Sequence, residues 1–174
     1  MVVSLPVRNE TILKWSLYGG ATLLIFVLQG LFLQRVSLWG VFPFLFPVLV
    51  AILASYEGPV PGAIFGLVIG VVCDLTIAAP LPCFYTLVFP LAGLAAALIA
   101  GGLISAGFLC SLVCSAAAFL MTDLFHALLL WAGGQDAWTS AGLLALRETG
   151  VSILFSPLVF FLFSAIHKKC HVDD

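Results

Sequence analysis

The sequence predicts an all-α integral membrane protein, a compact bundle of six transmembrane helices that forms a single domain over residues 1–174. Two observations lead to this fold class. Hydrophobic residues make up 63% of the chain and charged residues only 8%, whereas about 25% of residues are charged in an ordinary soluble domain. In addition, the uncharged stretches 15–34, 36–56 and 149–167 are each long enough to cross a hydrocarbon core about 30 Å thick.

The middle of the chain has few charged residues, so proline and glycine place the breaks between its spans. The clearest breaks are APLPC at 79–83 and GGLISAG at 101–107. The expected spans are 15–34, 38–55, 59–78, 83–104, 107–131 and 149–166. The loop before the last span, 132–148, contains DAWTSAGLLALRET, which we expect to form a short helix lying in the membrane interface.

The positions of the cationic residues predict the orientation of the bundle. An even number of spans brings both termini to one side of the membrane. Four cations lie near the termini: Arg8, Lys14, Lys168 and Lys169. The opposite side has only Arg35 and Arg147. Because cytoplasmic segments carry an excess of Lys and Arg, we expect both termini in the cytoplasm.

The third expected span contains a regular stripe of glycine. In GAIFGLVIGVVCDL, the residues Gly62, Gly66 and Gly70 are spaced four apart. Asp74 follows at the same spacing, so it lies on the same helix face. Helices in lipid associate through close van der Waals contact, for which glycine leaves room. We therefore expect this span to pack in the interior of the bundle.

The fourth expected span has small residues at the same spacing, namely Gly93, Ala97 and Gly101. A second groove of this kind predicts that the third and fourth spans form a close-packed hairpin. A further stripe in the fifth span is a candidate seat for a partner helix: Cys110, Cys114, Ala118 and Thr122.

Two acidic residues and a histidine within the expected spans are the candidate functional residues. Asp74 lies near the end of the third span, and Asp123 lies deeper in the fifth. His126 follows Asp123 by three residues, which places both side chains on one helix face within hydrogen-bonding reach. With cytoplasmic termini, both acids lie in the outer half of the bilayer, where Arg35 and Arg147 are the candidate counter-charges.

Three interpretations of these polar residues remain open: a structural network, a small-molecule pocket, and an ion or proton pathway. A proton pathway would place titratable groups through the whole depth of the membrane. The inner half has only Glu57, at an expected loop in SYEGPVPG. The structural interpretation is therefore favoured over the other two.

No pattern in the sequence predicts catalysis. The expected loops are too short to hold a soluble domain, no glycine-rich phosphate loop follows a strand, and no Ser, His and Asp set can be grouped. The five cysteines lack paired CxxC spacing, so we expect neither a disulfide framework nor a metal site. We therefore expect a protein with no enzymatic activity and no cofactor, surrounded by membrane lipid and binding no nucleic acid.

Several segments together resemble the MreD family of rod shape-determining proteins. A proline-containing second span is followed by the turn EGPVPG, then by GAIFGLVIGVVCDL, and then by Pro-Leu and another apolar hairpin. The ending, RETGVSILFSPLVFFLFSAIHKK, resembles that family's last span and basic tail. The resemblance covers most of 38–104 and 147–169. The residues that carry it are Gly66, Gly70, Asp74, Leu75, Pro80 and Leu81.

The resemblance implies a location in the bacterial cytoplasmic membrane and a scaffolding role in cell elongation and peptidoglycan synthesis. MreD proteins are six-span components associated with the single-span protein MreC, the MreB filament, a RodA-type glycosyltransferase and a class B penicillin-binding protein. The resemblance also implies an architecture similar to that of the S components of energy-coupling-factor transporters.

That second likeness provides an alternative function, a substrate-binding S component of a vitamin transporter. The polar residues of the outer half would suit a ligand pocket there. S components, however, typically dock the transport module through an AxxxA groove in their first span. The first span of this chain offers only Ser16 and Gly20 at that spacing.

Overall fold

The computed structural model describes residues 6–31, 33–35, 40–77, 81–102, 107–134 and 138–171. Every element in this part of the chain is helical. The elements are α1 (Pro6–Leu31), the short 3-10 helix η1 (Leu33–Arg35), α2 (Phe46–Glu57), α3 (Pro59–Thr76), α4 (Phe84–Gly102), α5 (Phe108–Ala132) and α6 (Trp138–His171). Five of these helices are long and apolar enough to cross a membrane, and α2 is shorter. The chain is therefore a helical protein of the multi-pass membrane type.

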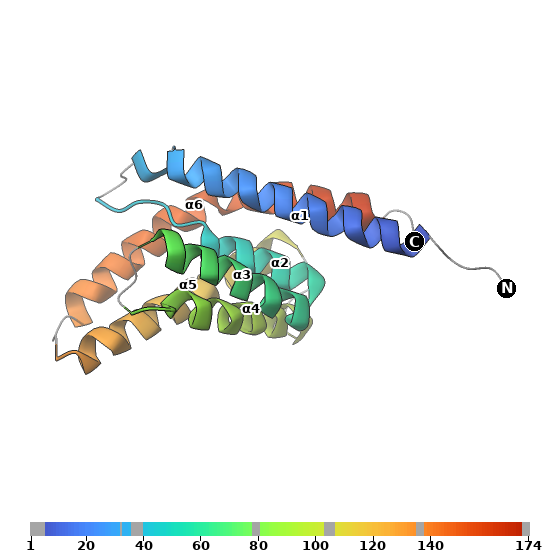
Figure 1. The fold of residues 1–174 in the computed structure, drawn as a ribbon. Helices are drawn as coiled ribbons and strands as arrows, with labels where there is room; N and C mark the ends of the chain where they lie inside the picture. The colour runs from blue at the N-terminus through green and yellow to red at the C-terminus, as the bar shows by residue number, and fades with distance from the viewer. Residues whose placement is uncertain are drawn as a thin grey trace.

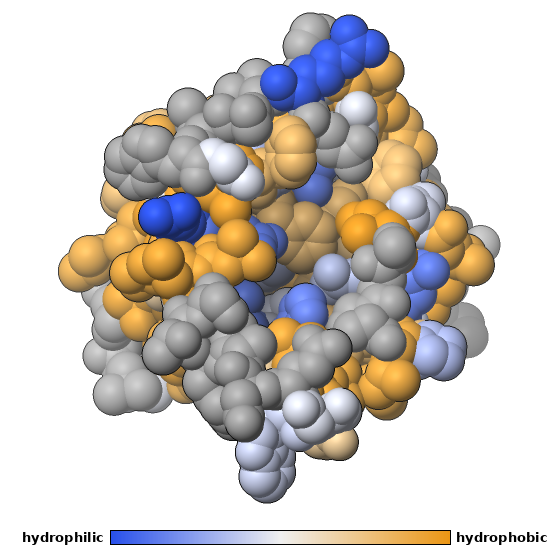
Figure 2. Space-filling model, turned by 90° about the vertical axis from the view of Figure 1, so that its left-hand side faces the viewer, coloured by the Kyte–Doolittle hydropathy of each residue, from blue (hydrophilic) through white to orange (hydrophobic). Residues whose placement is uncertain are grey.

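Helices α2 to α5 pack together, as Figure 1 shows. Helix α6 contacts α5 and α2 of this group and also α1, which lies outside it. Helix α2 contacts α3, α4, α5 and α6, so it is the central element. Helix α1 begins and α6 ends at the same end of the molecule, which we call the terminal end; the opposite end is the distal end. Figure 2 views the distal end and shows a hollow at its centre that holds hydrophilic side chains.

Three of the expected spans agree with α3, α4 and α5 to within two residues at each boundary. The second expected span, 38–55, does not form one helix of that length. Helix α2 begins only at Phe46, and 42–45 is not helical. Pro43 and Pro47 explain the difference, because proline donates no backbone hydrogen bond and disfavours a helical conformation in the residue before it. The 12 residues of α2 span only about 18 Å.

Helix α2 is nevertheless the most deeply enclosed element, since residues 46–54 are all buried. The non-helical segment before it is also held inside the protein. The backbone N–H of Phe44 donates to Ser152 Oγ of α6 at 2.9 Å, and that of Leu45 donates to Gln29 Oε1 of α1 at 3.0 Å. Irregular backbone at membrane depth requires such partners, because lipid provides none. Gln29 and Ser152 therefore complete the centre of the fold.

We expect Ser152→Ala to lower the free energy of unfolding by about 1–3 kcal/mol, because it leaves the N–H of Phe44 without its acceptor. Ser156→Ala is the matched control. Ser156 lies one turn further along α6 and is also buried, but its hydroxyl has no hydrogen-bond partner within the described residues. Its loss should therefore be neutral or stabilising. Unfolding of both purified variants in detergent measures the difference, and equal effects would contradict the proposed role of Ser152.

The expected interfacial helix within 132–148 and the expected last span, 149–166, are wrong as separate elements. Residues 138–171 form one continuous helix, α6, which contains Pro157. No proline or turn sequence interrupts the chain before Thr149, so the helix continues through this segment. Its 34 residues extend about 51 Å, more than a hydrocarbon core of about 30 Å requires. The first turns of α6 therefore lengthen the molecule at its distal end.

Candidate functional site

The glycine stripe of α3 lies directly against the backbone of α4. A Cβ atom added to Gly66 would lie 2.6 Å from the carbonyl oxygen of Phe89, and one added to Gly93 would lie 2.6 Å from that of Gly62. At Gly70 an added Cβ would meet the carbonyl of Tyr85. Real Cβ atoms essentially never approach other atoms this closely. The two helices therefore touch where only glycine fits.

In the small-residue stripe of α4, only Gly93 lies against the backbone of α3. Ala97 is buried in a cluster of small residues that also contains Ala51 of α2 and Cys114 of α5. Gly101 is exposed, and an added Cβ would meet no described atom within 4 Å, so its assignment to helix packing is wrong. The helices run antiparallel with Gly62 opposite Gly93. Gly101 therefore lies beyond the first residue of α3.

The candidate partner seat on the fifth span is also wrong. All four residues of that stripe are buried inside the chain: Cys110, Cys114, Ala118 and Thr122. The thiol of Cys114 donates to the carbonyl oxygen of Ala96 on α4 at 3.3 Å. The stripe packs within the protein and leaves no free face there for a partner helix.

Asp74 binds the first turn of α4 through both of its carboxylate oxygens. Its Oδ1 accepts from the backbone N–H of Tyr85 at 3.0 Å, and its Oδ2 accepts from the backbone N–H of Thr86 at 2.8 Å. The hydroxyl of Thr86 donates to the same Oδ2 at 2.6 Å. The first N–H groups of a helix have no partner within it, and negative charge is stabilising there. Asp74 thus caps α4 from the last turn of α3.

Asp123 and His126 do not form the expected hydrogen bond in the described structure. The Oδ2 atom of Asp123 accepts from the hydroxyl of Thr149 on α6 at 3.4 Å. The ring of His126 instead lies edge-on to Phe84 of α4, with centroids 5.9 Å apart, and the residue is exposed. The two side chains share a face of α5 but contact different neighbouring helices, Asp123 reaching α6 and His126 reaching α4.

The two candidate counter-charges, Arg35 and Arg147, are exposed. Neither pairs with Asp74 or Asp123, because the ion pairs among the described residues lie at the terminal end. Long cationic side chains near helix ends extend readily toward water. The acids of the distal half are therefore held by hydroxyl and backbone donors instead of by arginine.

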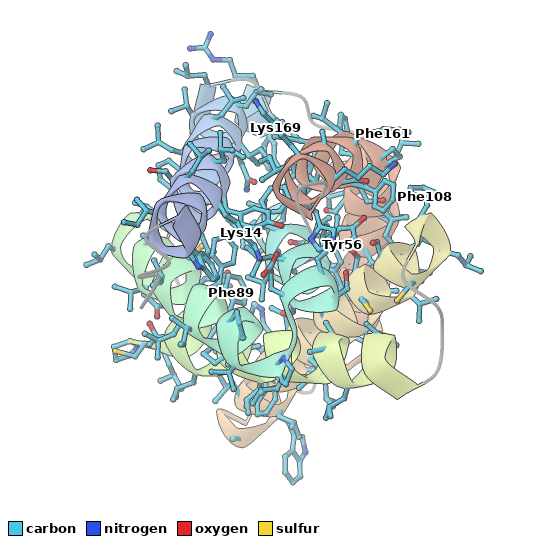
Figure 3. All side chains as sticks on the ribbon, turned by 90° about the vertical axis from the view of Figure 1, so that its right-hand side faces the viewer. Lys14, Tyr56, Phe89, Phe108, Phe161 and Lys169 are labelled. Atoms are coloured by element: carbon cyan, nitrogen blue, oxygen red, sulfur yellow. The ribbon has the colours of Figure 1, made fainter. Side chains whose placement is uncertain are left out.

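A polar cluster at the terminal end includes a residue that the sequence places in a loop. Glu57 is the last residue of α2, and its side chain is only 8% exposed. Its Oε2 lies 2.5 Å from Lys14 Nζ, and its Oε1 accepts from the hydroxyl of Tyr18 at 3.0 Å. His167 Nδ1 lies 3.5 Å from the same Oε1, and its ring stacks on Tyr56. Figure 3 views this end, where the cluster joins α1, α2 and α6.

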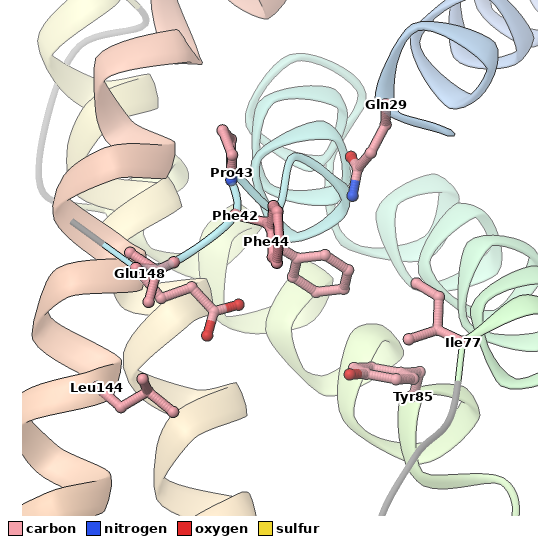
Figure 4. A pocket seen from close by; sticks show the side chains of 10 residues that line it. Gln29, Phe42, Pro43, Phe44, Ile77, Tyr85, Leu144 and Glu148 are labelled. Carbon is pink, nitrogen blue, oxygen red and sulfur yellow. The ribbon is translucent and has the colours of Figure 1, made fainter. Parts of the chain in front are cut away.

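The hollow at the distal end is an open cleft of about 500 Å³. It is lined by the non-helical segment before α2, by Gln29 and Ile77, and by Tyr85, Leu144 and Glu148. Figure 4 shows that the carboxylate of Glu148 and the hydroxyl of Tyr85 point into the space between them. Sequence analysis missed Glu148 because it lies at the edge of an expected span. Glu148 follows Leu144 by four residues, and this spacing could have indicated that the two side chains share a helix face.

Comparisons with protein-family models, with curated proteins and with solved structures gave no match to this chain. The resemblance to a family therefore rests on the motif residues alone, and three of these, Gly66, Gly70 and Asp74, lie together in the contact between α3 and α4.

Proposed function

We propose that this protein is a non-enzymatic scaffold of the bacterial cell-elongation complex, of the MreD type, in the cytoplasmic membrane with both termini in the cytoplasm. One observation carries the proposal. The motif residues Gly66, Gly70 and Asp74 all serve the contact between α3 and α4, where they fit backbone to backbone and cap a helix. These residues hold two helices firmly together, and a scaffold requires a rigid structure of this kind.

The arrangement of the polar residues supports a scaffold over an ion pathway. Asp74 and Asp123 lie in the distal half, whereas the cluster around Glu57 lies at the terminal end. Between these ends, the central helix α2 is buried and apolar through residues 46–54. Each group is engaged with neighbouring helices of the same chain. The polar contacts therefore hold the fold together at its two ends.

We place the binding site for a single-span MreC-type partner on α1. Of the five long helices, the candidate span in α1 has the smallest buried share, 22%. Ser16 and Gly20 are exposed on it one turn apart, and an added Cβ on Gly20 meets no described atom within 4 Å. A small-residue pair of this kind allows close approach of another helix. The other proposed members of the complex are MreB, the RodA-type glycosyltransferase and the class B penicillin-binding protein.

Affinity purification from gently solubilised membranes of the source cell tests this role. We expect an MreC-like protein to co-purify, and depletion of the chain to make the cells round. Gly20→Leu should reduce recovery of the partner severalfold, because it fills the contact face. Gly101→Leu is the matched control, since Gly101 is also exposed with open space around it.

The distal cleft favours a second candidate function, the S component of an energy-coupling-factor vitamin transporter. A cleft of about 500 Å³ lies within the range of roughly 300–1,000 Å³ that is typical of ligand sites. The same purification separates the two functions. Recovery of an ATPase pair with a transmembrane coupling protein, together with tight binding of a vitamin, would support the transporter function and contradict the scaffold function.

A further inference from the structure

Among the described residues that line it, the distal cleft combines aromatic rings with one charged side chain. Phe42 and Phe44 line it from the segment before α2, and Tyr85 lines it from α4. The rings of Phe44 and Tyr85 lie with centroids 5.7 Å apart, so they form a continuous aromatic surface. Glu148 lines the opposite side, and Figure 4 shows its carboxylate directed toward these rings.

The charge of Glu148 has no counter-charge in the described structure. Its carboxylate forms neither an ion pair nor a hydrogen bond there, and Glu148 is the one charged residue among the described residues that line the cleft. Asp123, also acidic, is close enough to interact with it electrostatically. Arg147 is its neighbour in sequence but is exposed and does not line the cleft. A carboxylate in apolar surroundings is costly unless a cation pairs with it.

We propose that the distal cleft binds an organic ammonium group carried on an apolar body, with Glu148 as its counter-ion. The faces of aromatic rings attract cations, so Phe42, Phe44 and Tyr85 would contact the ammonium group and its carbon substituents. A metal ion fits less well. Calcium takes six to eight oxygen ligands, and the described residues contain no group of three potential metal-binding side chains. This proposal is independent of the scaffold role.

Direct binding to the purified full chain tests the proposal with hexylammonium as the probe and with 1-hexanol and hexanoate as neutral and anionic controls. We expect only hexylammonium to raise the melting temperature in a concentration-dependent way. Glu148→Gln should weaken its binding about tenfold or more, because it removes the charge and keeps the shape. Asp123→Asn is the matched control. Asp123 is an acid of the same half that does not line this cleft. Because it is close enough to Glu148 to interact with it electrostatically, Asp123→Asn should weaken binding of the probe, but far less than Glu148→Gln does.

A second pair of variants keeps the test decisive if Glu148→Gln folds poorly. Leu144 lines the cleft one helical turn before Glu148, and Figure 4 shows both on the same side of α6. Leu144→Lys would place an ammonium group of the chain itself beside Glu148 and should block the probe. Leu144→Met keeps an apolar side chain of similar size in the lining, so it should bind the probe much more tightly than Leu144→Lys does. Equal binding by these two variants, or equal binding of hexanol and hexylammonium to the wild type, would overturn the proposal.

The source of the ammonium group is distinguished in lipid nanodiscs that contain phosphatidylethanolamine or phosphatidylglycerol. Retention of phosphatidylethanolamine in native mass spectra, lost in Leu144→Lys but not in Leu144→Met, would identify a membrane lipid headgroup as the ligand. Hexylammonium binding without lipid retention would identify a soluble amine. Preferential retention of phosphatidylglycerol by the wild type would contradict a cation site.

Discussion

Gly66→Leu should lower the free energy of unfolding by about 3 kcal/mol or more and greatly reduce the yield of folded protein. The added side chain would meet the carbonyl group of Phe89 and the backbone nitrogen of Pro90, neither of which can rotate away. Overpacking a close contact typically costs about 1–3 kcal/mol, and contact with backbone lies at the upper end or beyond. Because α3 and α4 form the closest helix pair described, the whole bundle should be affected.

Gly101→Leu provides the matched control for this prediction. It makes the same substitution within a helix of the same hairpin, at an exposed position where the described structure leaves open space. It should therefore unfold within about 0.5 kcal/mol of the wild type. Thermal unfolding of both variants in detergent provides the comparison. A Gly66→Leu protein as stable as the Gly101→Leu protein would show that α3 does not contact α4 as the structure has it.

Asp74→Leu should cost roughly 2–5 kcal/mol, because it leaves two backbone N–H groups and one hydroxyl in a partly buried site without their acceptor. Asp74→Asn should lie between the wild type and Asp74→Leu. Its amide keeps one acceptor oxygen but turns an NH₂ group toward a donor, since both carboxylate oxygens accept hydrogen bonds. Thr86→Val removes only the hydroxyl donor and should cost about 1 kcal/mol.

The same purified proteins, unfolded side by side, give the order of stability for Asp74→Leu, Asp74→Asn and Thr86→Val. The structural role predicts that loss of stability and loss of the proposed function in cell elongation follow the same order. If Asp74→Asn and Asp74→Leu both folded normally and both lost activity completely, the carboxylate would act through its charge, as an ion or ligand site requires.

The parts of the fold that follow from local sequence could be predicted, and those that depend on distant partners could not. Helices α3, α4 and α5 were expected to within two residues, because each is an apolar segment bounded by proline or glycine. The late start of the second helix at Phe46 was missed, because the non-helical backbone before it is tolerated only through Gln29 and Ser152, which lie elsewhere in the chain. Hydrophobic length alone contains no information on such partners.

The candidate site shows the same division. The spacing of Gly62, Gly66 and Gly70 was sufficient to place them on one face, and Asp74 followed from the same period. The expected hydrogen bond between Asp123 and His126 is not formed, because neighbouring helices decide which of two residues on a shared face meets which hydrogen-bond or ring partner. Glu148 was missed because only the folded chain brings the segment before α2 across from it.

The hydrogen bond between Phe44 and Ser152 can form only late in the synthesis of the chain. The two residues are 108 positions apart, and the acceptor lies in α6, which is synthesised after the other described helices. At roughly 5–20 residues per second, the N–H of Phe44 waits about 5–20 s for its partner after leaving the ribosome. During that time the backbone N–H of Phe44 lacks its native acceptor. A chain without α6 would therefore keep the backbone N–H of Phe44 without the acceptor that Ser152 provides.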